Sequence, residues 1–392
     1  MPDAPQGLPR AVRLPSLTGM RFVAAFLVFA FHVSFQTRFI SGGTGDFLST
    51  AVAKAGFYGV CFFFVLSGFV LTWSARAGDT APRIWRRRLV KIYPNHLVGF
   101  VLAAVLMTIA AQPIAVGDAV SNLFLVQTWW PDIAAANSMN AVSWSLACEL
   151  FFYLCFPLLL RGLNALPVRL LWSAVAVVAA LALAAPLVGQ YAISDHPLLP
   201  FIDKGQFSFT QIWFVYFFPP VRALEFVLGM LVARIVQTGH WPRIGLLPAA
   251  AIAAAGYAVT SNVPYLFSVA GAASLWLVPL VAAAAVADRD GLRSPFRTPA
   301  LVRLGELSFA FYMVHGLVVS YGYLWTVQGH HWSLLPSLGL LLAAFAASLA
   351  LALAMFTWVE SPAVRHFSNR RPTRREAATR PVAASVRMEA TE

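Results

Sequence analysis

Ten long apolar segments are the feature that most constrains how this chain of 392 residues can fold. A helix needs roughly 17–25 predominantly apolar residues to cross a bilayer. The segments cover residues 17–37, 55–75, 92–112, 142–162, 168–189, 219–238, 243–261, 265–287, 304–326 and 336–359. Charged residues make up only 11% of the chain, against about 25% in soluble domains. We therefore predict an all-α, polytopic membrane protein with about ten transmembrane helices.

The distribution of lysine and arginine predicts the orientation of these helices. With the N-terminus in the cytoplasm, 23 of the 28 basic residues fall on the cytoplasmic side and only three in outer loops. We expect both termini to be cytoplasmic and the protein to lie in the cell (cytoplasmic) membrane. The same bias, which favours the anionic inner leaflet, accounts for the net charge of +12 without a nucleic-acid partner.

The apolar pattern also predicts the domain organisation. We expect a cytoplasmic N-terminal segment at residues 1–13, one integral membrane domain at residues 14–362, and a basic, disordered cytoplasmic tail at residues 363–392. Two further apolar pieces, residues 121–130 and the aromatic run at residues 211–218, are predicted to be interfacial or re-entrant.

The first segment carries two ionisable residues, Arg21 and His32, at a depth where such groups are costly and often functional. They are eleven positions apart, which is about three helical turns plus 20°. Both therefore lie on one helix face, separated by about 16 Å along the axis. Two simpler explanations stay open: Arg21 snorkels toward inner phosphates, and His32 makes a hydrogen bond between packed helices.

The fourth segment places Ser145, Glu149 and Tyr153 on one helix face, because they recur every four residues. Counted at helical rise, Glu149 lies at a depth similar to that of His32, so we expect the two side chains to meet. A carboxylate beside an imidazole fixes its tautomer and raises its basicity, as a general base requires. The alternative is a structural carboxylate paired with another donor.

Further polar residues interrupt three other segments. Arg222 and Glu225 are three positions apart and can bind substrate or, more simply, pair with each other. His315, near mid-membrane, either contacts substrate or makes an interhelical hydrogen bond. Ser67 and Gly68 break a bulky run, which allows close helix packing or leaves room for a ligand chain next to the Ser67 hydroxyl.

A basic cluster leads into the third segment. Its members are Arg83, Arg86, Arg87, Arg88 and Lys91. A cluster on the cytoplasmic side needs no further function, but this one is denser than the topology requires, and guanidinium groups suit phosphates. It lies on the same side of the membrane as Arg21.

Together these motifs resemble the membrane acyltransferase-3 family. The matching positions are Arg21 and His32 (R-x10-H), Ser67, Gly68 and Phe69 (SGF), Arg87, Arg88, Lys91 and Pro94, then Trp144, Ser145, Leu146, Glu149, Phe152 and Tyr153, then Arg222, Glu225, Phe226 and Gly229, and finally Leu304, Glu360 and Pro362. The resemblance covers about residues 14–362. One R-x10-H pattern is weak, whereas the ordered set is specific.

The resemblance implies transfer of a short acyl group, acetyl or similar, from acyl-CoA to a hydroxyl. It implies that Arg21 and His32 are essential and that acyl-CoA is a co-substrate. We expect no tightly bound cofactor and no metal. Some members of the family acylate surface glycans, and others acylate macrolide-type or other secondary metabolites. We therefore expect one of these two classes of hydroxylated acceptor.

The sequence supports direct transfer as the working mechanism, with a transient acyl-histidine as the other possibility. Acyl-CoA phosphates would meet Arg21, Arg87, Arg88 and Lys91, with Ser67 near the donor, while His32 acts as base and Glu149 orients it. The candidates for binding substrate are Trp144, Ser145, Tyr153, Arg222, Glu225 and His315. A secondary transporter or flippase for a lipid-linked or polyketide substrate is the alternative, since membrane His and Glu residues can relay protons. The sequence shows no inverted repeat to favour it.

Overall fold

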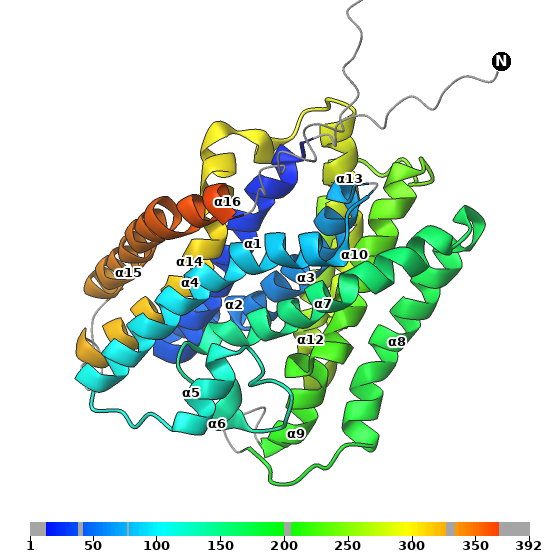
Figure 1. The fold of residues 1–392 in the computed structure, drawn as a ribbon. Helices are drawn as coiled ribbons and strands as arrows, with labels where there is room; N and C mark the ends of the chain where they lie inside the picture. The colour runs from blue at the N-terminus through cyan, green and yellow to red at the C-terminus, as the bar shows by residue number, and fades with distance from the viewer. Residues whose placement is uncertain (1–12, 38–41, 77, 200–204, 327–333, 368–392) are drawn as a thin grey trace, which may run out of the picture.

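The computed structural model describes residues 13–37, 42–76, 78–199, 205–326 and 334–367. Within these ranges, nine helices are long and apolar enough to cross a membrane. The remaining predicted segment forms α11 (Leu246–Asn262), which is apolar but has only 17 residues. The chain is thus an all-helical, multi-pass membrane protein (Figure 1).

Each predicted segment contains one of the longer helices. In addition to α11, these are α1 (Pro15–Thr37), α3 (Ala55–Ser74), α4 (Ala81–Ile109), α7 (Trp144–Ala165), α8 (Leu171–Tyr191), α10 (Pro219–Gln237), α13 (Ser274–Arg289), α14 (Pro299–Thr326) and α15 (Leu334–Met355). Shorter elements connect them: α2 (Gly42–Val52), α5 (Val116–Leu123), α6 (Ile133–Ala136), η1 (Ala141–Ser143), η2 (Val168–Leu170), α9 (Phe209–Ile212), η4 (Trp213–Phe217), α12 (Tyr265–Val269), η5 (Gly271–Ala273), η6 (Pro295–Arg297), η7 (Phe356–Glu360) and α16 (Ser361–Phe367).

Three boundaries differ from the prediction. The predicted segment at residues 265–287 is divided into α12, η5 and α13. Helix α4 begins at Ala81, well before the apolar segment at residues 92–112, so the basic cluster forms its first turns. At the C-terminal end, α16 extends to Phe367. Most of the predicted terminal segments, residues 1–12 and 368–392, lie outside the described residues.

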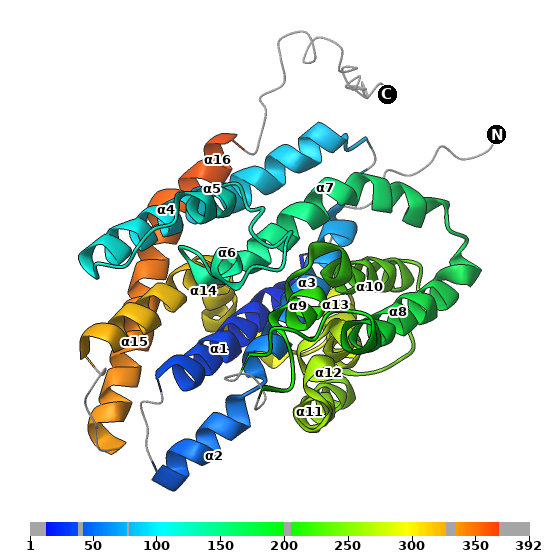
Figure 2. The same cartoon turned by 90° about the horizontal axis from the view of Figure 1, so that it is seen from below.

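The bundle has an inner and an outer group of helices. More than half of the apolar window is buried in α1, α3, α10, α13 and α14, whereas α4, α8 and α15 are mostly exposed on the outside of the bundle. Figure 2 shows α1 and α3 near the middle, with α15, α4, α7, α8 and α11 around them. The mostly exposed outer surfaces are apolar, as expected for helices that face lipid.

Two glycines let α3 and α10 cross in close contact. A Cβ added to Gly68 would lie 1.9 Å from the backbone oxygen of Phe226, and one added to Gly229 would lie 2.0 Å from the oxygen of Val65. Only glycine fits at such a crossing, which is typical of membrane helix interfaces. The packing explanation for Gly68 is therefore confirmed.

The start of α1 is held by a residue from the far end of the sequence. The Ser16 amide donates to Asp288 Oδ2 (2.8 Å), and the Ser16 hydroxyl donates to Asp288 Oδ1 (2.7 Å). Amides at a helix N-terminus have no partner within the helix, and a carboxylate is favoured there. Asp288, near the end of α13, therefore fixes the position from which α1 starts.

The two additional apolar pieces behave differently. The first lies between α5 and α6, which sit together at one end of the bundle (Figure 1). The aromatic run forms α9 and η4, leads into α10, and buries Tyr216 and Phe217, so its prediction as an interfacial or re-entrant piece stays a prediction. The Tyr216 ring lies 4.4 Å from the Trp144 ring, between centroids, so the run is part of the core.

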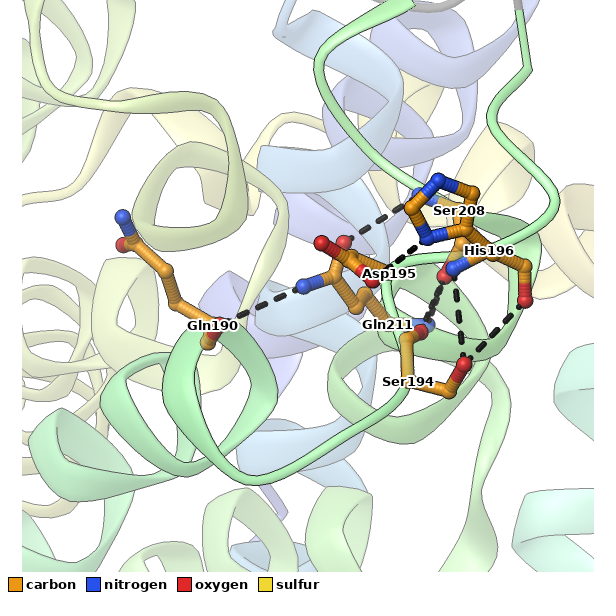
Figure 3. A network of polar contacts seen from close by, with 6 residues as sticks. All are labelled: Gln190, Ser194, Asp195, His196, Ser208 and Gln211. Carbon is orange, nitrogen blue, oxygen red and sulfur yellow. Dashed lines mark hydrogen bonds and ion pairs between the residues drawn. The ribbon is translucent and has the colours of Figure 1, made fainter.

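The connection between α8 and α9 is held by a polar network (Figure 3). Ser208 caps α9, because its hydroxyl accepts from the Gln211 amide (3.1 Å) and donates to the Ser194 carbonyl (2.6 Å). Asp195 and His196 pair at 2.7 Å, and this hydrogen bond holds the pKa of Asp195 below its usual value. The Ser194 hydroxyl contacts backbone atoms of His196 rather than its imidazole, so these residues do not form a hydrolytic triad.

Candidate active site

A cavity lies between α1, α3, α4, α7 and α14. Its empty volume is about 850 Å³, counted with the solvent at its opening. The polar and charged residues that line it are Arg21, Ser67, Arg88, Lys91, Ser145, Glu149, Tyr153, Ser308 and Tyr312. The rest of the wall is aliphatic and aromatic, including Val60, Phe63 and Ile92. Seven of the residues proposed from the sequence thus face one space.

A chain of hydroxyl groups ends on the carboxylate in this cavity. Ser67 Oγ donates to the Tyr153 hydroxyl (3.4 Å), which donates to Glu149 Oε2 (2.8 Å). Tyr153 and Glu149 are one helical turn apart, so the fourth-residue spacing seen in the sequence does bring them together. No contact among the described residues engages Glu149 Oε1, which leaves it available to a ligand with an N–H or O–H group.

Three cations from α1 and α4 share the cavity with this carboxylate. Lys91 forms an ion pair with Glu360, and Glu360 also accepts from the Asn95 amide (2.6 Å). The Arg88 guanidinium lies 5.9 Å from the centre of the Tyr153 ring. Arg21 makes no ion pair or hydrogen bond with another described residue. The cavity therefore presents positive charge that the described side chains neutralise only in part.

Arg87, the other predicted phosphate contact, is placed differently. It pairs with Asp79 at 2.6 Å and does not belong to the cavity wall. Partial burial works to raise the pKa of Asp79, but the hydrogen bond and charge of Arg87 outweigh it and hold that pKa below its usual value. Its role in binding the donor stays a prediction.

His32 pairs with a second histidine and not with Glu149. His32 Nδ1 lies 3.0 Å from the Val28 carbonyl oxygen and 3.1 Å from His315 Nε2. His315 is fully buried, whereas His32 is partly exposed. The expected hydrogen bond between Glu149 and His32 is absent among the described contacts: the Glu149 carboxylate accepts from Tyr153, and the partner of His32 is His315.

Tyr312 connects the cavity with the histidine pair and was not among the residues predicted from the sequence. Its hydroxyl lies 2.8 Å from Ser145 Oγ and donates to the Val142 carbonyl (3.2 Å). Its ring is 5.6 Å from that of His315, between centroids. The only available signal was position: Tyr312 is three residues before His315 and shares its helix face.

The remaining predicted substrate contacts lie in the core. Arg222 and Glu225 are fully buried and pair at 3.1 Å, as the simpler explanation proposed. Arg222 also donates to the Val269 carbonyl (3.3 Å). Trp144 is buried against Tyr216. None of the three predicted residues lines the cavity, and a role in binding substrate stays a prediction for each.

Comparison with known proteins places this site in a family. The family described as "Acyltransferase domain" matches residues 14–357. The acyltransferase MdmB of Streptomyces mycarofaciens is 41% identical over 375 residues, which cover 93% of this chain and 95% of the relative. The alternative of a transporter loses its basis, because the match to an acyltransferase extends over nearly the whole chain.

More distant relatives share only part of the chain. The peptidoglycan O-acetyltransferase OatA of Listeria monocytogenes is 30% identical over 162 residues, or 37% of this chain and 24% of the relative. OatA of Staphylococcus aureus is 30% identical over 169 residues, or 38% and 25%. No solved structure gave a significant match. The helical bundle, its cavity and these matches together show that the chain belongs to the acyltransferase-3 family and is a multi-pass membrane acyltransferase.

Proposed function

We propose that the protein transfers a short acyl group, acetyl or similar, from acyl-CoA to a hydroxyl of a glycan or of a macrolide-type metabolite. The observation that carries this proposal is the placement of Arg21 and His32 on α1. Arg21 lines the cavity beside Arg88 and Lys91, and His32 lies about 16 Å further along the same helix. One helix thus links an anion-binding region to a base.

The cavity suits the donor in shape and charge. CoA carries phosphates at one end of a long, thin arm with two amide groups, and guanidinium groups are well suited to phosphates. Arg21, Arg88 and Lys91 would bind the phosphates, and the apolar wall would enclose the arm. Ser67 and Glu149 would then meet the amides of the arm. In this proposal Glu149 positions the donor and acts through Tyr153, not through His32.

The reaction needs only one base in the right tautomer. The acceptor hydroxyl gives its proton to His32 Nε2 while its oxygen attacks the thioester carbonyl carbon. The carbon–sulfur bond then breaks, and the CoA sulfur leaves and takes the proton from His32. The products are the ester and free CoA. Because His32 is not part of the cavity wall, we propose that the Tyr312 side chain moves aside when the thioester reaches the histidine.

The distribution of basic residues supports the location of this chemistry. We propose ten transmembrane helices, α11 included, with both termini in the cytoplasm and the protein in the cytoplasmic membrane. The basic start of α4 would then face the cytoplasmic pool of acyl-CoA.

The test uses the full chain in lipid nanodiscs with radiolabelled acetyl-CoA. Two probes serve as acceptors: a macrolide with a free sugar hydroxyl and a soluble chitin oligosaccharide. His32→Ala should abolish both label transfer and acceptor-dependent release of CoA. His240→Ala is the matched control, since His240 is exposed and its side chain hydrogen-bonds only the carbonyl of Thr238 among the described residues. Transfer at the wild-type rate by a folded His32→Ala variant would refute the assignment.

A further inference from the structure

His32 and His315 approach each other through an arrangement that repeats on two helices. Each ring turns its Nδ1 toward the backbone carbonyl four residues earlier: His32 toward Val28 (3.0 Å) and His315 toward Phe311 (3.2 Å). A carbonyl oxygen can only accept a hydrogen bond. Each Nδ1 must therefore carry a proton for either contact to be favourable.

These two contacts determine which ring nitrogen donates and which accepts in the hydrogen bond between the histidines. A neutral His315 with a proton on Nδ1 has a lone pair on Nε2, and this nitrogen lies 3.1 Å from His32 Nδ1. The Nδ1–H of His32 is then shared between the Val28 carbonyl and His315 Nε2, a three-centre hydrogen bond. His32 Nε2 is left without a proton. That is the nitrogen a general base needs.

The surroundings hold His315 in this position. It is fully buried on α14, and its ring stacks on Phe311 with 11° between the planes and 5.8 Å between the centroids. Phe29 packs against its edge at 6.3 Å. No described carboxylate hydrogen-bonds either histidine. The acceptor that orients His32 is therefore an imidazole, where many other catalytic bases are oriented by a carboxylate.

We propose that His315 is a positioning residue that selects the Nδ1–H tautomer of His32 and stabilises the imidazolium formed when His32 takes the acceptor proton. This rests on the proposed role of His32 as base. A hydrogen bond becomes stronger when its donor is charged, so His315 Nε2 binds the protonated His32 more tightly than the neutral one. The preference lowers the barrier to proton transfer without any contact between His315 and the substrate.

The kinetic test compares His315→Leu with His315→Gln. Leucine fills similar space and accepts no hydrogen bond, whereas the glutamine Oε1 can occupy the place of Nε2. Loss of a hydrogen bond to a charged group predicts that kcat falls about 10- to 100-fold in His315→Leu, with the KM for acetyl-CoA within about twofold of wild type. His315→Gln should recover most of the loss. A purely structural role would lower the folded fraction and leave kcat per folded molecule unchanged.

His96 supplies the matched control. It is also fully buried, and its Nε2 contacts the Asn122 carbonyl at 3.0 Å, away from the cavity wall. His96→Leu should lower thermal stability while kcat per folded molecule stays at the wild-type value. If His96→Leu reduces kcat as His315→Leu does, or if His315→Leu keeps the wild-type kcat, the inference is overturned.

A spectroscopic measurement tests the same point in case His315→Leu does not fold. The chain has eight histidines, so the signals of His32 are identified as those present in solid-state ¹⁵N spectra of labelled wild type and missing from His32→Gln, in which the signals of its partner His315 shift but remain. We expect a protonated Nδ1 and an unprotonated Nε2. The opposite tautomer would overturn the inference. An active His32→Ala refutes the proposed function itself, whereas an inactive His32→Ala with a fully active His315→Leu refutes only the role of His315.

Discussion

The crossing of α3 and α10 gives the sharpest test of how the bundle is held together. A methyl group added by Gly68→Ala would lie 1.9 Å from the Phe226 backbone oxygen. Ordinary contact begins at 3.4 Å, so the two helices must separate locally by about 1.5 Å. Both atoms belong to backbone or are fixed to it, and no side-chain rotation relieves the clash.

The magnitude follows from the packing on either side of this crossing. Phe69 and Phe226 are both completely buried there, and a gap of 0.5–1 Å already loses roughly a quarter to a half of the attraction between neighbouring atoms. We therefore expect a loss of stability at or above the upper end of the usual cost of overpacking, about 3 kcal/mol. Because Ser67 precedes Gly68 and lines the cavity, acyl transfer should fall as well.

The assay is thermal unfolding in detergent, followed with a thiol-reactive dye, because Cys61 and Cys148 are buried and become reactive only on unfolding. Gly322→Ala is the control: nothing lies within 4 Å of its added methyl group, and an alanine in a helix is favoured over glycine by up to about 1 kcal/mol. Gly229→Ala should repeat the defect from the opposite helix. A Gly68→Ala protein with the melting temperature and the acyl-transfer rate of the wild type would refute the reasoning.

Three further results are expected. Arg222→Met leaves the Glu225 carboxylate buried without its partner and should lower the free energy of unfolding by about 3–5 kcal/mol, measured by thermal unfolding. Adding Glu225→Leu should restore part of this stability, and no recovery in the double variant would contradict the prediction. Ser208→Ala removes the cap of α9 and should cost about 1 kcal/mol, seen as faster amide exchange confined to that connection; unchanged exchange would count against it. Tyr153→Phe removes the donor to Glu149 and should raise the KM for acetyl-CoA about tenfold while the melting temperature stays near wild type, and an unchanged KM would reject it.

The helices were predictable because a bilayer requires apolar segments of a certain length, and this length can be counted directly in the sequence. All ten predicted segments are helical, but α11 has only 17 residues, and the segment at residues 265–287 is divided, so that α13 has 16. The start of α4 was placed too late because hydropathy detects the apolar part of a helix only. Charged turns such as those around Arg87 and Arg88 are equally helical but do not register as apolar.

The residues that line the cavity were predicted more successfully than the partner of His32. Arg21, Ser67 and Glu149 do face a common space, since helical spacing fixes the face on which each residue lies. The expected contact between Glu149 and His32 failed because equal depth says nothing about direction around a helix. Helix α1 packs mainly on α14, so the partner of His32 comes from there. Tyr312 was missed for the same reason.

The two distant partners of α1, Asp288 and His315, have a consequence for how the protein is made. Asp288 is 272 residues from Ser16, and His315 is 283 residues from His32. During synthesis the first helix enters the bilayer long before either partner leaves the ribosome, at about 5–20 residues per second. It must wait there with its N-terminal amides uncapped by Asp288 and its histidine without His315. Chains that stop before α14 is inserted are therefore expected to be inactive, because they lack the partner of His32.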